Sequence, residues 1–163
     1  MKSFIYNSRR FAMIKKIQLF SFFLVFILTT TSVQAMTNIK SSHDVKTTAD
    51  RLEKVLKDKG MTIFARIDHA AGAKKVDKEL RPTELVIFGN PKIGTLLMQC
   101  KQTVGIDLPM KALVWQDSSD QVWFSYDEPE VMKQKHSVQG CDPVFEKIKG
   151  ALANFAKVAT SAG

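Results

Sequence analysis

The chain has 163 residues, of which 45% are hydrophobic and 25% charged, and its net charge is +8. Five basic residues and no acidic residue precede Ala35, so residues 36–163 carry a net charge of only +3, with both signs interspersed. This balance is typical of an ordinary protein surface and argues against a nucleic-acid-binding protein.

Residues 1–35 have the three parts of a secretory signal peptide. A basic segment is followed by an apolar run at 17–28 and by a small, polar stretch that ends in Val33-Gln34-Ala35. The apolar run has about 12 residues, whereas a membrane-spanning helix needs roughly 20. We therefore expect cleavage after Ala35, no stable membrane anchor, and a protein that is periplasmic or secreted. Translation could start at Met1 or at Met13, which would give a more compact signal.

Residues 36–163 have the length of a single globular domain. This part of the chain contains two cysteines, Cys100 and Cys141. An oxidising compartment favours a disulfide between them. Cys100 also falls on the apolar side of a predicted helix, where a free cysteine would pack as a small hydrophobic residue. The sequence leaves the bridge open.

The first half of this domain predicts strand, helix, strand. A short strand at 37–40 precedes an amphipathic helix at 43–59, which Gly60 ends. Alternation over 61–68 predicts a half-buried strand with Met61, Ile63, Ala65 and Ile67 on one side. A looser segment with about one helical turn then runs from His69 to residue 82.

The second half begins with a strand at 83–88 that stops at Gly89-Asn90-Pro91. Asn90 is a good helix cap and proline suits the first helical turn. The predicted helix carries an apolar stripe of Ile93, Leu96, Leu97, Cys100 and Val104. Two strands at 111–116 and 121–126 form a hairpin around the polar loop 117–120. A short polar helix at 131–135 and a long helix at 142–159 complete the chain.

This order of elements predicts an α+β fold. The hairpin requires antiparallel pairing, and no glycine-rich phosphate loop joins a strand to a helix. We expect a largely antiparallel sheet with the two long helices, about 43–59 and 142–159, packed on one face.

Four segments, in this order, resemble one known family. They are Phe64-Ala-Arg-Ile-Asp-His69, Phe88-Gly-Asn-Pro-Lys-Ile-Gly-Thr-Leu-Leu-Met98, Asp107-Leu-Pro-Met-Lys111 and Tyr126-Asp-Glu-Pro129. They are similar to the signatures of domain-of-unknown-function family 302, and the resemblance covers about residues 37–160. It implies a compact α+β fold that tends to dimerise, and it implies no established activity.

The turn at Gly89-Asn90-Pro91 is the most distinctive local feature. The start of the helix behind it could hold a small anion or polar ligand. The candidate binding residues are Asn90, Lys92, Gly94 and Thr95. The competing interpretation is that Asn90 and Pro91 only turn the chain from strand to helix.

His69, next to Asp68, is the candidate catalytic residue for acid–base chemistry. Adjacent residues of a strand point to opposite faces, so a structural or merely exposed histidine is the competing interpretation. A soft metal-ligand set could be assembled from the two cysteines, His136 and three methionines, Met98, Met110 and Met132. These residues lack a recognised metal spacing, so we expect no metal and no cofactor.

Trp115 and Trp123 flank the hairpin loop and could lie in the core, in a groove or at a dimer face. The leading hypothesis is an exported, non-enzymatic ligand-binding or accessory module that forms a homodimer. One alternative is a small acid–base enzyme that uses His69 on a small polar substrate. Another is an envelope protein that acts through protein contacts.

Overall fold

The computed structural model describes residues 35–162. The predicted signal peptide, residues 1–35, lies outside the described residues except for Ala35. Within the described part, the elements follow the order strand, helix, strand, helix, strand, helix, 3-10 helix, strand, strand, helix, helix, which fits an α+β domain.

Five strands form one sheet in the order β1-β5-β4-β3-β2, and every neighbouring pair is antiparallel. The predicted hairpin is confirmed: β4 pairs with β5, and Trp115 lies opposite Trp123. The strands are β1 (Met36–Lys40), β2 (Thr62–Asp68), β3 (Thr83–Gly89), β4 (Met110–Gln116) and β5 (Val122–Asp127).

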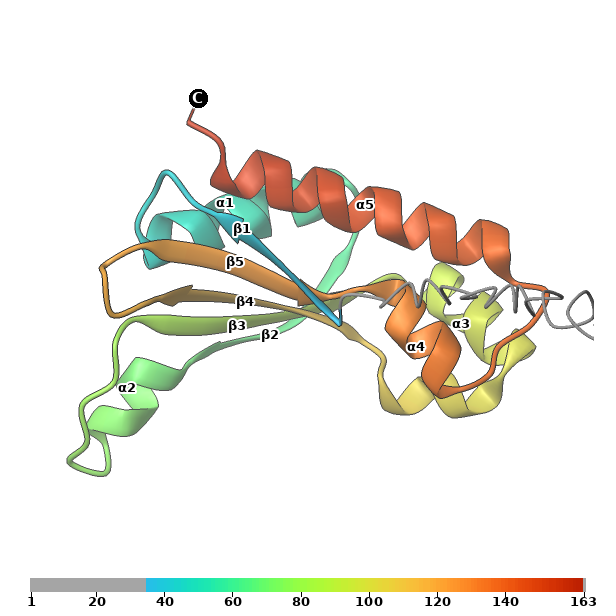
Figure 1. Ribbon diagram of the computed structural model, residues 1–163, viewed down its shortest axis with the longest axis horizontal. Helices are drawn as coiled ribbons and strands as arrows, with labels where there is room; N and C mark the ends of the chain where they lie inside the picture. Colours follow the sequence, from blue (N-terminus) through green and yellow to red (C-terminus); the bar gives the residue numbers. More distant parts are fainter. Residues whose placement is uncertain (1–34, 163) are drawn as a thin grey trace, which may run out of the picture. The chain divides into compact units, whose positions relative to one another are not determined.

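Two long helices cover one face of this sheet, as the sequence predicted (Figure 1). They are α1 (Val45–Asp58) and α5 (Asp142–Thr160). Their apolar faces meet alternate residues of the strands, because successive strand side chains point to opposite faces. We call the result the main cluster; its buried members include Leu52, Leu56, Val86, Phe88, Val114, Phe124, Leu152 and Phe155.

Polar contacts fix the ends of these helices. Asp44 caps α1 by accepting a hydrogen bond from the Thr47 backbone N–H (2.6 Å). Gly60 follows the helix with φ +67°, the left-handed conformation that glycine adopts most easily. Arg51 of α1 donates to the backbone oxygens of Val158, Ala159 and Ser161. These carbonyls at the end of α5 would otherwise lack partners within the helix.

A second group of apolar residues lies at the other end of α5. It brings together α3 (Pro91–Cys100), the 3-10 helix η1 (Gln102–Ile106), α4 (Pro129–Lys135) and the first turns of α5. We call it the end cluster; its buried members are Leu97, Val104, Met132, Val138, Cys141 and Phe145. In the structure Cys100 is bonded to Cys141, which ties the end of α3 to the start of α5.

The predicted alternation of β2 is wrong. A register shift between Ile63 and Ala65 interrupts the strand, so residues before and after it change sides. Arg66 therefore lies toward α1, where its Nη1 donates to Asp50 (2.6 Å) and its Nε donates to Glu84. Burial alone would lower the pKa of Arg66, but these hydrogen bonds raise it above the usual value.

The predicted apolar stripe of α3 is also wrong in part. Leu97 is the only buried residue of α3, and Leu96 is 45% exposed. The helix ends at Cys100 because Lys101 is extended, with φ −155°, so Val104 belongs to η1 instead. Cys100 is exposed and does not lie on a buried helical face.

The face of the sheet that points away from α1 and α5 is only half-buried. It carries Leu85, Ile87, Leu113, Trp115 and Trp123, each in alternation with a residue that faces the helices. The two tryptophan rings stack with centroids 6.4 Å apart. We call this surface the open face. Among the described residues neither long helix covers it; the short α2 (His69–Lys74) lies near β3 (Figure 1).

Replacing both Cys100 and Cys141 by alanine tests the tie between α3 and α5. The bridge closes a segment with a sequence separation of 41 residues. The chain-entropy relation gives a loss of about 4 kcal/mol in the free energy of unfolding for such a loop. Urea denaturation followed by tryptophan fluorescence measures this loss.

Each single cysteine variant serves as the control, because losing either partner removes the same bridge. We expect both single variants to lose nearly as much stability as the double variant. Stability equal to that of the unchanged protein in the double variant would contradict the structural role.

Candidate ligand-binding cavity

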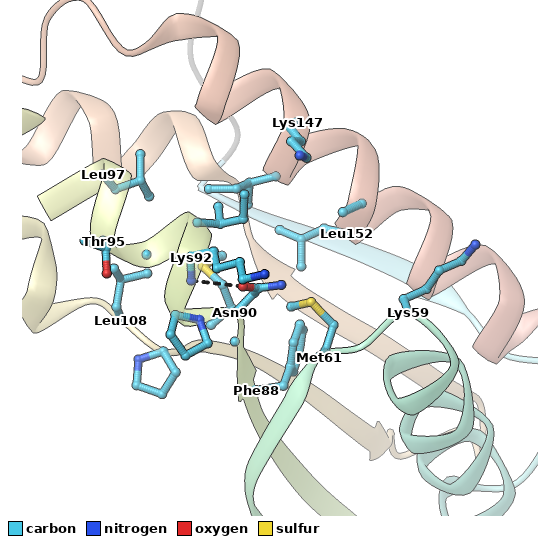
Figure 2. Close-up of a pocket in the computed structure, with 18 of the residues that line it drawn as sticks. Lys59, Met61, Phe88, Asn90, Lys92, Thr95, Leu97, Leu108, Lys147 and Leu152 are labelled. Atoms are coloured by element: carbon cyan, nitrogen blue, oxygen red, sulfur yellow. Dashed lines mark hydrogen bonds between the residues drawn. The ribbon is translucent and has the colours of Figure 1, made fainter. Parts of the chain in front are cut away.

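A cavity of about 800 Å³ lies where the main cluster and the end cluster meet. Its walls come from the end of β3, most of α3, the segments 59–64 and 105–110, and the middle of α5. Figure 2 shows Phe88, Leu97 and Leu152 around it, each contributed by a different element. All three side chains are almost fully buried. The lining is therefore mostly apolar.

The cavity lies next to residues that pack against both the main cluster and the end cluster. Met110 and Ile148 are partly buried and pack against both clusters. Both also line the cavity. α5 contributes Phe145 to the end cluster and Leu152 and Phe155 to the main cluster, so its middle spans the space between them.

The turn before α3 forms one wall of this cavity. Asn90 caps the helix: its side chain accepts a hydrogen bond from the Lys92 backbone N–H (3.0 Å), drawn in Figure 2. The Ile93 and Gly94 backbone N–H groups donate to the Asn90 backbone oxygen. The first N–H groups of α3 thus already donate hydrogen bonds to Asn90. None of these groups is free to bind the anion that the sequence suggested for this turn.

All four ligand-binding residues proposed from the sequence line the cavity. They are Asn90, Lys92, Gly94 and Thr95. A Cβ added to Gly94 would lie 3.5 Å from Leu108 Cδ1, an ordinary van der Waals contact, so an alanine would fit here. The sequence thus located one wall, but not the apolar interior supplied by α5 and the segment 105–110.

His69 is not among the cavity residues. It is exposed at the first position of α2. Its neighbour Asp68 caps α2 by accepting a hydrogen bond from the Ala71 N–H (2.8 Å). One oxygen of the carboxylate next to His69 therefore caps the start of α2.

Three lysines line the cavity, and the described lining contains no Asp or Glu. Lys59 follows α1, Lys92 lies in the first turn of α3, and Lys147 lies on α5 (Figure 2). All three side chains are exposed. Sequence reasoning missed Lys59 and Lys147, because they are far from the turn in the chain and only the fold brings them to it.

A polar cluster that the sequence did not predict joins η1 to α4. His136 Nε2 lies 2.6 Å from Asp107 Oδ2, and His136 Nδ1 lies 3.0 Å from Thr103 Oγ1. Lys135 Nζ donates to the other Asp107 oxygen (2.6 Å). Burial would raise the pKa of Asp107, but the bonds from Lys135 and His136 bring it below the usual value. These contacts hold the end cluster together outside the cavity.

Metal-ligating residues are not gathered in this domain. Within residues 35–162, no group of three or more His, Cys, Asp or Glu side chains could hold a metal ion. Met98 and Met110 line the cavity, while Cys100 and Cys141 are bonded to each other. In the same residues no helix combines the length and apolar character needed to cross a bilayer.

Curated relatives of this chain share part of its sequence. The "Fluoride-specific ion channel FluC 1" of Brucella suis is 47% identical over 103 residues, covering 63% of this chain and 41% of the relative. The "Fluoride-specific ion channel FluC 2" of Brucella melitensis is also 47% identical over 103 residues, which cover 63% of this chain and 38% of the relative. The chain thus spans about two fifths of the length of these relatives.

A solved structure and a family model agree on the fold and the family. The structure of an uncharacterized conserved DUF302 protein from Bacillus stearothermophilus matches with a TM-score of 0.71 at 17% identity, covering 78% of this chain and 99% of that one. The model of the Domain of unknown function DUF302 matches residues 37–155. The resemblance expected from the sequence is confirmed, and the chain belongs to the DUF302 family.

Proposed function

We propose that this protein is an exported, non-enzymatic module that binds a ligand in the cavity between its two apolar clusters. The observation that carries the proposal is the cavity of about 800 Å³, because small-molecule sites are typically apolar hollows of roughly 300–1,000 Å³ with a few polar groups. The few polar groups here are Asn90, Thr95, Asn154 and the three lysines.

The disulfide and the start of the fold support export. A Cys100–Cys141 bridge persists in oxidising compartments and is rare in a reducing cytosol. The first strand, β1, begins at Met36, immediately after the predicted cleavage site. Cleavage there would leave the whole sheet intact.

The relationship to the fluoride channels supports an accessory role. Residues 1–34 and 163 are too few to contain an alignment of 103 residues, so most of it falls within the described domain. The channel name belongs to relatives more than twice as long as the matched segment. We propose that the matched segment is an accessory domain of those proteins, and that the same domain has an accessory role in this chain.

Narrowing the cavity tests the proposed binding. Ala151→Phe places a ring in the cavity from the middle of α5. An uncharged fluorescent dye, 1-N-phenylnaphthylamine, should bind the unchanged protein and bind this variant about tenfold more weakly, a loss of roughly 1.4 kcal/mol. A fluorescence titration measures both affinities.

The matched control is Ala153→Phe, which makes the same change at an exposed position of α5 outside the cavity. Its dye affinity should equal that of the unchanged protein. Sodium fluoride should alter the titration no more than sodium chloride at equal ionic strength. Absence of dye binding, or equal loss in both variants, would reject the cavity as the site.

The open face supports the homodimer. Its half-exposed apolar side chains lie side by side on three neighbouring strands, β3, β4 and β5. Contiguous apolar patches of this kind mark interaction sites, and aromatic residues such as Trp115 and Trp123 are enriched at interfaces. We propose that a second copy of the chain covers this face.

Sedimentation analysis of the protein starting at Met36 tests this assembly. Leu113→Lys places a charge in the middle of the open face and should convert a dimer into a folded monomer. Val158→Lys is the control, because Val158 is 41% exposed on α5, away from that face. A monomeric unchanged protein, or a Leu113→Lys variant that stays dimeric, would contradict this interface.

A further inference from the structure

We infer that the cavity ligand is an amphiphile: an apolar body that carries an anionic head, either a carboxylate or a phosphate. The inference rests on the proposed function, since it names the chemistry of the ligand in that same cavity. Two independent features of the lining lead to it, namely the apolar interior and the charge of the side chains around it.

The interior selects for an apolar body. Phe88, Leu97 and Leu152 are each at most 2% exposed and line the cavity. Met61, Ile148 and Ala151 extend this surface. A small, strongly hydrated anion alone would gain nothing from these contacts, whereas each buried methylene group of a chain would gain the hydrophobic contribution.

The lysines select for a negative head. Lys59, Lys92 and Lys147 come from three different elements, and the fold brings them to one cavity. No carboxylate accompanies them in the described lining. Three lysines of α1 show the contrast, since each pairs with an acidic residue four positions away: Lys46 with Asp50, Lys54 with Asp58 and Lys57 with Glu53.

The start of α3 adds to this positive potential. Its N-terminus carries the positive end of the helix dipole toward the cavity wall at Asn90 and Lys92. The first N–H groups of this turn are occupied, so the charged donors to an anion are the lysine ammonium groups, beside the neutral side chains of Asn90, Thr95 and Asn154. Long lysine side chains can reach a head group at the cavity edge while their stems pack on apolar surface.

A cationic amphiphile would meet three like charges in this cavity, and an uncharged one would leave the lysines unused. The shared chemistry is therefore a single apolar chain with an anionic end. A fatty acid supplies it as a carboxylate, and a single-chain phospholipid supplies it as a phosphate.

The test is displacement of 1-N-phenylnaphthylamine from the protein starting at Met36 by four molecules with the same chain, each used below its micelle concentration or solubility limit. They are dodecanoate, dodecyl phosphate, 1-dodecanol and dodecyltrimethylammonium. We expect the two anions to displace the dye at concentrations roughly tenfold or more below those of the other two. Preference between dodecanoate and dodecyl phosphate separates the fatty acid from the phospholipid source.

Variants of the lysines assign the head group to its site. Lys59→Gln, Lys92→Gln and Lys147→Gln should each weaken dodecanoate binding about two- to fivefold, the range expected of exposed ion pairs. Dye affinity should not change, because the dye is uncharged. Lys149→Gln is the matched control, an exposed lysine of α5 outside the cavity, and should bind dodecanoate normally.

The outcomes separate the two proposals. If the dye binds but all four molecules displace it equally, or none displaces it, the ligand is not an anionic amphiphile. The cavity would still be a binding site in either case. Lysine variants that bind dodecanoate as tightly as the Lys149→Gln control would also overturn it. No dye binding to the unchanged protein would reject the proposed function itself.

Discussion

The packing of α5 against two separate apolar clusters is the constraint on which the rest of this structure depends. The first turns of the helix bury Phe145 in the end cluster, and its later turns bury Leu152 and Phe155 in the main cluster. One rigid helix therefore sets the spacing between the clusters. The cavity is the space that this spacing leaves beneath the middle of the helix.

Covalent and polar links keep the end cluster in its place. The Cys100–Cys141 bond joins the end of α3 to the start of α5, and the contacts of His136 with Asp107 and Thr103 join α4 to η1. At the opposite end of α5, Arg51 bonds to the last carbonyl groups and ties the helix to α1. Both ends of α5 are thus tied to neighbouring elements.

Much of the fold was predictable from local sequence signals. The periodicity of the helices, the Asn90-Pro91 cap and the polar hairpin loop each act over a few residues. The two long helices, the start of α3 and the hairpin were found close to their predicted bounds. The register shift at Ile63 and the end of α3 at Cys100 were missed. Both depend on tertiary packing, which overrides local periodicity.

The cavity lining, too, was predictable only where its residues are neighbours in the chain. The wall around Asn90 was predictable because its residues are adjacent in the chain. Lys59 and Lys147 could not be assigned to the site, since nothing local connects residues at the ends of α1 and in α5. His69 attracted a catalytic interpretation only through its neighbour Asp68, which in the structure caps α2.

Mapping the dye onto the protein tests whether the cavity beneath α5 is the binding site. Two-dimensional amide NMR spectra of the isotope-labelled protein starting at Met36 would be recorded with and without 1-N-phenylnaphthylamine. If the dye binds in the cavity, the largest shift changes fall on cavity residues such as Gly94, Gly105 and Ala151. Changes confined to the open face around Leu113, or no changes at all, would contradict binding in the cavity.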